Sequence, residues 1–159
     1  MQNKIAAGAM SISMAALLFI SNQEGFSPYP YKDIDGVWTN GYGNATINPK
    51  RKVDQQQALD DLHKNVNAIG DKMSDCIKVP ISQDQYDAYL NLSYNIGYGA
   101  FCKSSIVKKL NNGDDVGSCE AIMKYTFVGG KDCKDKSNKC LGIVKRREYE
   151  RDLCLKGLQ

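Results

Sequence analysis

Two carboxylic acids and one hydroxyl lie within a short stretch of the chain, and their types and spacing suit acid–base chemistry. Glu24 follows a long uncharged run, where apolar neighbours would favour its protonated form. Asp33 lies in a polar stretch beside Lys32, where an ionised carboxylate is easily solvated. Cleavage of a glycosidic bond needs this combination, because one acid protonates the leaving oxygen while the other carboxylate activates water or attacks the anomeric carbon. The hydroxyl of Thr39 could hydrogen-bond a water held by Asp33.

Turn-forming residues between these side chains indicate how they come together. Pro28 and Pro30 fix the backbone φ angle, and Asp35-Gly36 is a hairpin signal. We therefore expect the chain to reverse direction and bring the later two side chains back toward the first. On the residues alone an alternative stays open, in which these acids are solvated loop residues.

Four segments carry a resemblance to a known family. Residues 24–43, EGFSPYPYKDIDGVWTNGYG, resemble the catalytic signature of the phage lysozymes, the endolysins of glycoside hydrolase family 24. Later segments are similar to later blocks of that family: QDQYDAYLNLSYNIG (Gln83 to Gly97), GAFCKSSIVKKLNNGD (Gly99 to Asp114) and GIVKRREYERDL (Gly142 to Leu153). The resemblance covers residues 24–155 and implies an α+β, lysozyme-like fold with a small antiparallel β lobe and a larger helical lobe.

The resemblance also implies an activity. The protein would be a muramidase that hydrolyses the β-1,4 bond between N-acetylmuramic acid and N-acetylglucosamine in peptidoglycan, with inversion and without metal or cofactor. Glu24 would be the general acid and Asp33 the carboxylate that activates or positions water. Thr39 would help to hold that water.

Three further positions are interpreted through the same resemblance. Tyr94 and Asn95 would face the saccharide, although on the residues alone they also fit a plain helix C-terminus. Many family members carry His just after the T-x-G-Y-G run, where this chain has Asn44. A pH-dependent contact from that position is therefore in doubt.

The chain begins with a segment typical of membrane targeting. Lys4 and Glu24 are separated by 19 uncharged residues, and the apolar stretch spans residues 5–20. A cleaved signal peptide lacks a well-placed cleavage site, a permanent anchor would insert only marginally, and a buried helix is the third possibility.

We therefore hypothesise a signal-anchor-release endolysin that acts in host cell lysis. Residues 1–23 would tether the inactive enzyme to the periplasmic face of the host inner membrane, and residues 24–159 would form the catalytic domain. Release into the periplasm would follow collapse of the membrane potential. Met14 to Gln23 would then have to form the helix that precedes Glu24 in the active enzyme.

Six cysteines in a chain of 159 residues indicate an oxidising compartment and up to three disulfides. Six cysteines allow 15 pairings, so the connectivity stays open. The pair favoured first is Cys133 with Cys140, which would close a Lys-rich loop, and Cys76–Cys102 and Cys119–Cys154 are its companions. Zinc is the rival interpretation, but the chain has no C-x-x-C pair and only one histidine, His63.

Charge and composition narrow the remaining functions. The net charge of +3 suits an anionic cell wall and is too small to indicate nucleic-acid binding. The clusters Lys50-Arg51-Lys52 and Lys145-Arg146-Arg147 are interpreted as solvated faces. A membrane-tethered peptidoglycan-binding module and a lytic transglycosylase are the competing functions, and we expect a monomer.

The remaining pattern predicts the elements that position the site. Short antiparallel strands are expected within residues 37–47, and a helix capped by Asp54 is expected to end near Gly70. Ser82 would cap a second helix that ends at Gly97. Its core candidates are Tyr86, Tyr89, Leu90 and Leu92. Beyond it we expect helices, apart from a loop at residues 129–142.

Overall fold

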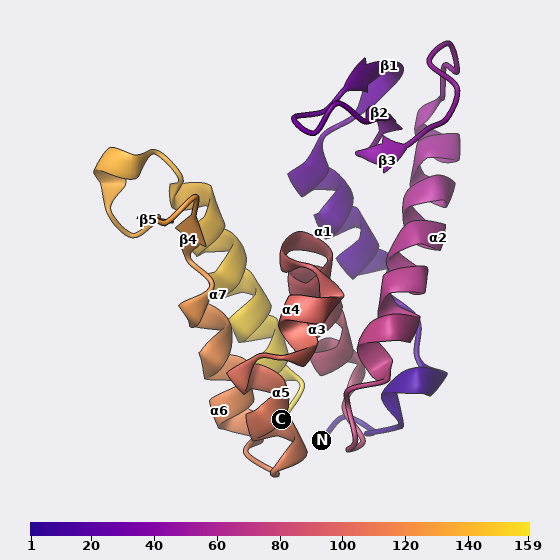
Figure 1. Cartoon of the computed structure of the whole chain (residues 1–159). Helices are drawn as coiled ribbons and strands as arrows, with labels where there is room; N and C mark the ends of the chain where they lie inside the picture. The colour runs from indigo at the N-terminus through magenta and orange to yellow at the C-terminus, as the bar shows by residue number, and fades with distance from the viewer. The chain divides into compact units, whose positions relative to one another are not determined.

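The computed structural model describes the whole chain, residues 1–159, which divides into two compact units. Residues 12–68 form the first, which we call the sheet unit, and residues 1–11 with 69–159 form the second, the helical unit. The mixture of helices and small antiparallel sheets confirms the predicted α+β class. In chain order the elements are η1 (Ala7–Ala9), α1 (Met14–Glu24), β1 (Ser27–Lys32), β2 (Trp38–Gly41), β3 (Asn44–Ala45), α2 (Gln55–Ser74), α3 (Gln83–Ile96), α4 (Tyr98–Cys102), α5 (Ser105–Asn111), α6 (Asp115–Glu120), η2 (Ala121–Lys124), β4 (Phe127–Val128), β5 (Lys131–Asp132), η3 (Lys136–Asn138) and α7 (Leu141–Lys156) (Figure 1).

A three-stranded antiparallel sheet in the order β1-β2-β3 gives the sheet unit its name and confirms the predicted small sheet. Strand β1 was not expected, because Pro28 and Pro30 cannot donate backbone hydrogen bonds. It is tolerated at the edge of the sheet, where the register shifts between Ser27 and Tyr31. The predicted turn at Asp35-Gly36 joins β1 to β2, with Gly36 at a φ of 78°.

Helix α2 approaches strand β2 closely. A Cβ placed on Gly41, whose φ is 61°, would lie 2.8 Å from the Cβ of Ala58, so a larger residue would push the strand away from the helix. The predicted cap is present, since the Asp54 carboxylate accepts a hydrogen bond from the N–H of Gln57 at 2.8 Å.

The predicted end of this helix near Gly70 is wrong, because α2 continues to Ser74. Gly70 lies inside the helix, and a Cβ there would lie 2.3 Å from the hydroxyl oxygen of Tyr86. Close packing between α2 and α3 therefore requires this glycine, and no chain reversal takes place at it.

Helix α3 is the buried centre of the helical unit. Every residue from 85 to 93 is buried, and the predicted core residues Tyr86, Tyr89, Leu90 and Leu92 are at most 1% exposed. Ser82 and Gln85 form the predicted capping box at its start. The helix ends at Gly97, whose φ of 90° stops it as expected. Helices α4 and α7 pack against it.

The expected loop at residues 129–142 is more structured than predicted. Strands β4 and β5 pair Phe127 with Asp132 and Val128 with Lys131, and η3 follows. Gly129 and Gly130 both adopt positive φ, so the chain reverses there within two residues. Helix α7 already begins at Leu141.

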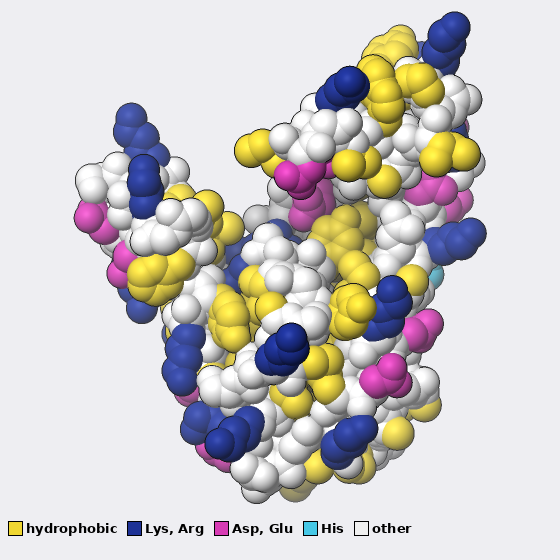
Figure 2. All heavy atoms as spheres, viewed as in Figure 1, with side chains coloured by type: hydrophobic (Ala, Val, Ile, Leu, Met, Phe, Trp, Pro, Cys, Tyr) yellow, Lys and Arg dark blue, Asp and Glu magenta, His cyan; other side chains and the backbone are white.

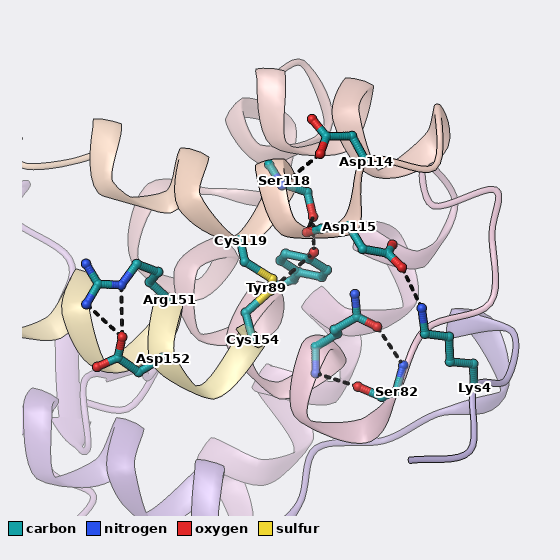
Figure 3. Close-up of a disulfide and its surroundings, with 12 residues drawn as sticks. Lys4, Ser82, Tyr89, Asp114, Asp115, Ser118, Cys119, Arg151, Asp152 and Cys154 are labelled. Carbon is teal, nitrogen blue, oxygen red and sulfur yellow. Dashed lines mark hydrogen bonds and ion pairs between the residues drawn. A yellow bond between two sulfur atoms is a disulfide. The ribbon is translucent and has the colours of Figure 1, made fainter. Parts of the chain in front are cut away.

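Three disulfides close the helical unit and confirm the predicted pairs Cys76–Cys102, Cys119–Cys154 and Cys133–Cys140. Cys119–Cys154 joins α6 to α7 beside a buried tyrosine, as Figure 3 shows. The oxygens of Tyr89 and Ser118 lie 2.6 Å apart next to this disulfide. Because all six cysteines are oxidised, none is a thiolate that could bind zinc.

The first eleven residues are attached to the helical unit by specific contacts. Ile5 pairs with Ile81 through two backbone hydrogen bonds of 2.9 Å. The ammonium of Lys4 lies 2.6 Å from the carboxylate of Asp115, and the Gln2 amide donates to Asp84 at 2.6 Å (Figure 3 shows the Lys4 contact). None of the helices combines the length and the apolar character needed to cross a bilayer.

Candidate active site

Glu24 is the last residue of α1, and the structure of this helix fixes where it lies. Ser13 caps the helix by accepting from the N–H of Ala16 at 3.2 Å, and Gly25 ends it at a φ of 73°. The helix buries Ala16, Leu17, Ile20 and Ser21. Glu24 itself is exposed, which corrects the expectation that apolar side chains enclose it, because the buried stripe ends one turn earlier.

Glu24 contacts the turn that follows β2. Its Oε2 lies 3.7 Å from the point that a Cβ on Gly43 would occupy, and Gly43 has a φ of 82°. The rings of Phe26 and Tyr42, whose centroids are 5.5 Å apart, join the same two segments. A Cβ at residue 43 would make only an ordinary contact with this carboxylate, so it is the positive φ of the turn that requires Gly43 beside the acid.

Asp33 organises the hairpin between β1 and β2. Its Oδ1 accepts from the backbone N–H of Asp35 at 2.9 Å and of Val37 at 2.8 Å. Its own backbone N–H donates to the carbonyl of Val37, and its carbonyl accepts from Gly36, both at 3.0 Å. The side chain is therefore held by the turn it creates, and both bonds fall on one oxygen.

Thr39 lies in β2 and is only 4% exposed. The register pairs Tyr31 with Thr39, and the bonds between Asp33 and Val37 continue this ladder. Because side chains alternate along a strand, Asp33 and Thr39 project from the same face of the hairpin. The Thr39 hydroxyl donates to the carbonyl of Val37 at 3.1 Å, which uses its one hydrogen, so toward a water it can act only as an acceptor.

The structure places Tyr94 and Asn95 near the end of α3, in the helical unit. Tyr94 is half-buried and Asn95 is exposed. The Oδ1 of Asn95 accepts a short hydrogen bond from Nη2 of Arg147.

Arg147 and its neighbours form a buried ionic group that sequence reasoning missed. The interpretation of Lys145-Arg146-Arg147 as a solvated face is wrong for its two arginines, because Arg146 is 5% and Arg147 1% exposed. Glu150 is fully buried and pairs with Arg147 at 2.6 Å and with Arg146 at 3.2 Å. The signal was present in the sequence, since Glu150 follows the two arginines by four and three residues along one helix face.

Burial and pairing act against each other in this group. Desolvation raises the pKa of the Glu150 carboxyl, and the two guanidinium groups oppose that rise. Desolvation likewise lowers the pKa of Arg147, and Glu150 opposes that change. Arg147 also donates through Nε to the carbonyl of Tyr125 at 2.9 Å. Bonds in three directions therefore fix the guanidinium in place.

Other candidate sites are less well supported. No group of three or more His, Cys, Asp or Glu side chains is arranged to hold a metal ion. His63 lies half-buried on α2. On the face seen in Figure 2, Lys and Arg side chains are spread over the surface instead of gathering in one patch. Glu24, Asp33 and Thr39 therefore stay the candidate catalytic residues.

Comparison with protein families matches residues 21–150 to the phage lysozyme family. The chain belongs to this family. This phage lysozyme is 34% identical over 160 residues to a SAR-endolysin of Enterobacteria phage P21, a match that covers 98% of this chain and 93% of the relative. It is therefore a glycoside hydrolase of peptidoglycan, a muramidase of the endolysin type, and the resemblance that the sequence suggested is confirmed.

Solved structures agree with the phage lysozyme fold. The muramidase domain of SpmX from Asticaccaulis excentricus gives a TM-score of 0.79 at 25% identity and covers 91% of this lysozyme and 97% of that chain. The active form of the P1 phage endolysin Lyz gives a TM-score of 0.73 at 28% identity, with coverage of 96% and 89%. The small sheet and the larger helical part are therefore those of a lysozyme, as expected.

Proposed function

We propose that Glu24, Asp33 and Thr39 carry out glycan hydrolysis as acid, water-activating carboxylate and water-positioning hydroxyl. The observation that carries this proposal is the hairpin, in which Asp33 and Thr39 share one face and Oδ1 of Asp33 is already occupied by two backbone N–H groups. The other carboxylate oxygen, Oδ2, is then the one that takes a proton from water. Thr39 accepts the second hydrogen of that water and fixes its direction.

Glu24 supplies the proton that the leaving sugar oxygen needs. This carboxyl is exposed, so the leaving oxygen of a bound glycan can reach it. The carboxyl lies beside Gly43 in the turn that follows β2. The pair therefore divides the work as inverting glycosidases do, with one acid on each side of the scissile bond.

Substitution of each acid by its amide tests these roles. Glu24→Gln and Asp33→Asn should each lower clearing of chloroform-treated Gram-negative cells by at least 10²-fold, the scale of a lost general acid or base. In the Asp33→Asn variant the side-chain amide oxygen can keep both turn bonds. Asp35→Asn, which changes an exposed acid of the same turn, is the matched control and should stay within about twofold of wild type.

Analysis of the digest by mass spectrometry separates hydrolysis from its nearest rival. A lytic transglycosylase leaves anhydro-muramic products and has no use for a second acid. If Asp33→Asn keeps full activity and the products are anhydro sugars, the assignment of Asp33 and Thr39 is wrong. Reducing ends that carry one oxygen from solvent support it.

We propose further that residues 1–23 tether the inactive enzyme to the host inner membrane and that residues 24–159 act after release into the periplasm. The name SAR-endolysin of the P21 relative supports this. A second support is that the apolar stretch 5–20, which would enter the membrane, also packs in the folded enzyme. Its buried members Ala7, Ile12, Ala16, Leu17 and Ile20 belong to the folded core. They cannot lie in lipid at the same time, so the tethered chain lacks both α1 and a correctly placed Glu24.

Fractionation of infected or expressing cells tests the tether. In energised cells the full-length protein should sediment with inner membranes and the wall should stay intact. Addition of a protonophore should move the uncleaved protein to the periplasm and start lysis. Soluble, active enzyme in energised cells would contradict the proposal.

We also propose that the enzyme acts as a monomer on peptidoglycan. The proposed catalytic residues all come from residues 24–39 of one chain, so no second copy is needed to complete the set. Sedimentation of the released enzyme should give the mass of one chain, 17.6 kDa.

A further inference from the structure

The sheet unit contains a small polar pocket between strand β3, the loop that follows this strand, and helix α2, elements that Figure 1 labels. Its volume is about 180 Å³. The residues that form its walls are Asn44, Ala45, Arg51, Asp61, Lys64 and Asn65. Ordinary small-molecule sites measure ~300–1,000 Å³, so this pocket has room for one small chemical group and not for a whole ligand. The proposed catalytic residues do not line it.

Both asparagines of the pocket have a fixed orientation. Asn44 is buried, and its side chain lies 3.4 Å from the carbonyl oxygen of Ala58. A carbonyl oxygen only accepts, so the Asn44 atom that faces it must be Nδ2, and Oδ1 must point the other way. That Oδ1 accepts from Nδ2 of Asn65 at 2.8 Å. Asn65 therefore presents an NH₂ group at the pocket wall, and this bond uses only one of its hydrogens.

The carboxylate in the pocket wall is already occupied. Oδ2 of Asp61 lies 3.2 Å from Nη2 of Arg51, and Oδ1 accepts from the side chain of Gln57 at 3.1 Å. The backbone of Arg51 is held as well, because its carbonyl accepts from the side chain of Asn40 at 2.9 Å. A guanidinium carries more donors than the bond to Asp61 uses. Arg51 therefore extends from a fixed backbone position and keeps N–H groups for a ligand.

Lys64 adds a positive charge that no carboxylate compensates. It is exposed and lies one turn after Asp61 on α2, and its ammonium has no hydrogen-bond or ion-pair partner in the protein. Arg51 and Lys64 together outweigh the single negative charge of Asp61. The pocket is therefore positive, and the donors that remain available in it come from Arg51, Lys64 and Asn65.

We propose that this pocket binds a phosphate group. The phosphate oxygens accept from the guanidinium of Arg51, the ammonium of Lys64 and the NH₂ group of Asn65. A tetrahedral oxyanion suits three separate donors, whereas a carboxylate has only two oxygens. The phosphate belongs either to an anionic phospholipid headgroup or to a free phosphate ion. This inference goes beyond glycan hydrolysis and does not depend on which residues carry out that reaction.

The test uses the purified full-length protein with inorganic phosphate as the probe. Titration at constant ionic strength should shift the NMR signals of the Arg51 Nε–H group and of the Asn65 side-chain amide, and chloride should not. Lys64→Gln removes the uncompensated charge and should weaken phosphate binding about tenfold. Arg51→Lys keeps the charge but loses the planar fork of donors, so it should weaken binding too. Lys103→Gln, the same change of charge at an exposed residue outside the pocket, should leave phosphate affinity unchanged.

Lipid vesicles separate the two sources of phosphate. Wild type and Lys64→Gln are sedimented with phosphatidylglycerol vesicles, and because both carry residues 1–23, a difference between them reports on the pocket. If wild type binds these vesicles more tightly than Lys64→Gln, and phosphatidylcholine vesicles show no such difference, the ligand is an anionic headgroup. If inorganic phosphate binds and the two proteins bind vesicles equally, the ligand is free phosphate.

Three results would overturn the proposal. One is a set of NMR shifts with chloride equal to those with phosphate, and another is undiminished phosphate binding by Lys64→Gln. The third is acetate that displaces phosphate at equal concentration, since the pocket would then recognise a carboxylate. Thermal unfolding of Lys64→Gln should match that of wild type, because the residue is exposed, so a loss of binding is not a loss of folding.

Discussion

If residues 1–23 tether the enzyme as proposed, replacing Ala15 by aspartate should free it from the membrane without disabling it. Ala15 is exposed in the first turn of α1, where a negative charge is stabilised by about 0.3–1 kcal/mol through the helix dipole. The lower helix propensity of aspartate, up to about 0.7 kcal/mol, offsets this gain. The stability of the folded enzyme should therefore change by less than about 1 kcal/mol.

In the proposed tethered chain the same residue lies inside the apolar stretch 5–20, two to three residues beyond its centre. An aspartate at the centre of an inserted helix opposes insertion by about 2.5–3.5 kcal/mol. This corresponds to a shift of about 60- to 300-fold from the inserted to the free form. The leader is only marginally apolar, so a shift of this size should abolish the tether.

Cell fractionation with an activity assay measures both halves of this prediction. Export is scored by disulfide formation, because the cysteines stay reduced in the cytoplasm. The exported Ala15→Asp protein should be periplasmic in energised cells and cause early lysis. As a purified protein it should have wild-type muramidase activity. Ile47→Asp adds the same charge at a residue that is 104% exposed and outside the leader, and it should remain tethered. Membrane retention of exported Ala15→Asp equal to that of wild type would refute the reasoning.

Three further predictions concern stability. Loss of Cys119–Cys154 should destabilise the protein by about 3.8 kcal/mol and loss of Cys133–Cys140 by about 2.4 kcal/mol, because the loop-closure entropy grows with the separations of 35 and 7 residues. Urea unfolding of the two paired Cys→Ala variants measures which loss is larger. Equal losses would argue against the entropic account. Gly70→Ala should destabilise the protein by about 1–3 kcal/mol despite the better helix propensity of alanine, because the new Cβ would meet the hydroxyl of Tyr86. Tyr86→Phe removes that hydroxyl and should recover part of the loss in the double variant. Additive effects of the two substitutions would show that the close contact is unimportant. Burial raises the pKa of Tyr86 and Tyr89 from 10 to about 12, so these tyrosines ionise in the unfolded chain at a lower pH than in the folded one. The free energy of unfolding should therefore fall between about pH 10 and 12, by up to about 1.4 kcal/mol per pH unit for each tyrosine. Tyr89→Phe removes one of the two hydroxyls and should lower that slope, which alkaline unfolding followed by circular dichroism would detect.

The parts of the fold that sequence predicted well are those set by local chemistry. Caps at Asp54 and Ser82, the stop at Gly97 and the turn at Asp35-Gly36 each depend on a few neighbouring residues. The candidate acids also stood out by type and spacing, and the structure adds the hydrogen bonds that hold Asp33.

What sequence reasoning missed depends on partners far along the chain. Gly70 was mistaken for a helix end because its reason is the hydroxyl of Tyr86 on another helix. Strand β1 contains two prolines, which are tolerated only because its position is at the sheet edge. The link between Asn95 and Arg147 joins residues 52 positions apart, and a run of basic residues on a helix gives no sign of such burial.

All three covalent cross-links lie between residues 76 and 154, whereas the sheet unit contains no cysteine. On the tether proposed above, an order of assembly follows. The oxidised portion, residues 69–159, can fold early, before residues 1–11 attach to it. The cysteine-free portion, which needs α1, condenses only once the leader withdraws, so the last part to assemble is the part that bears the acids.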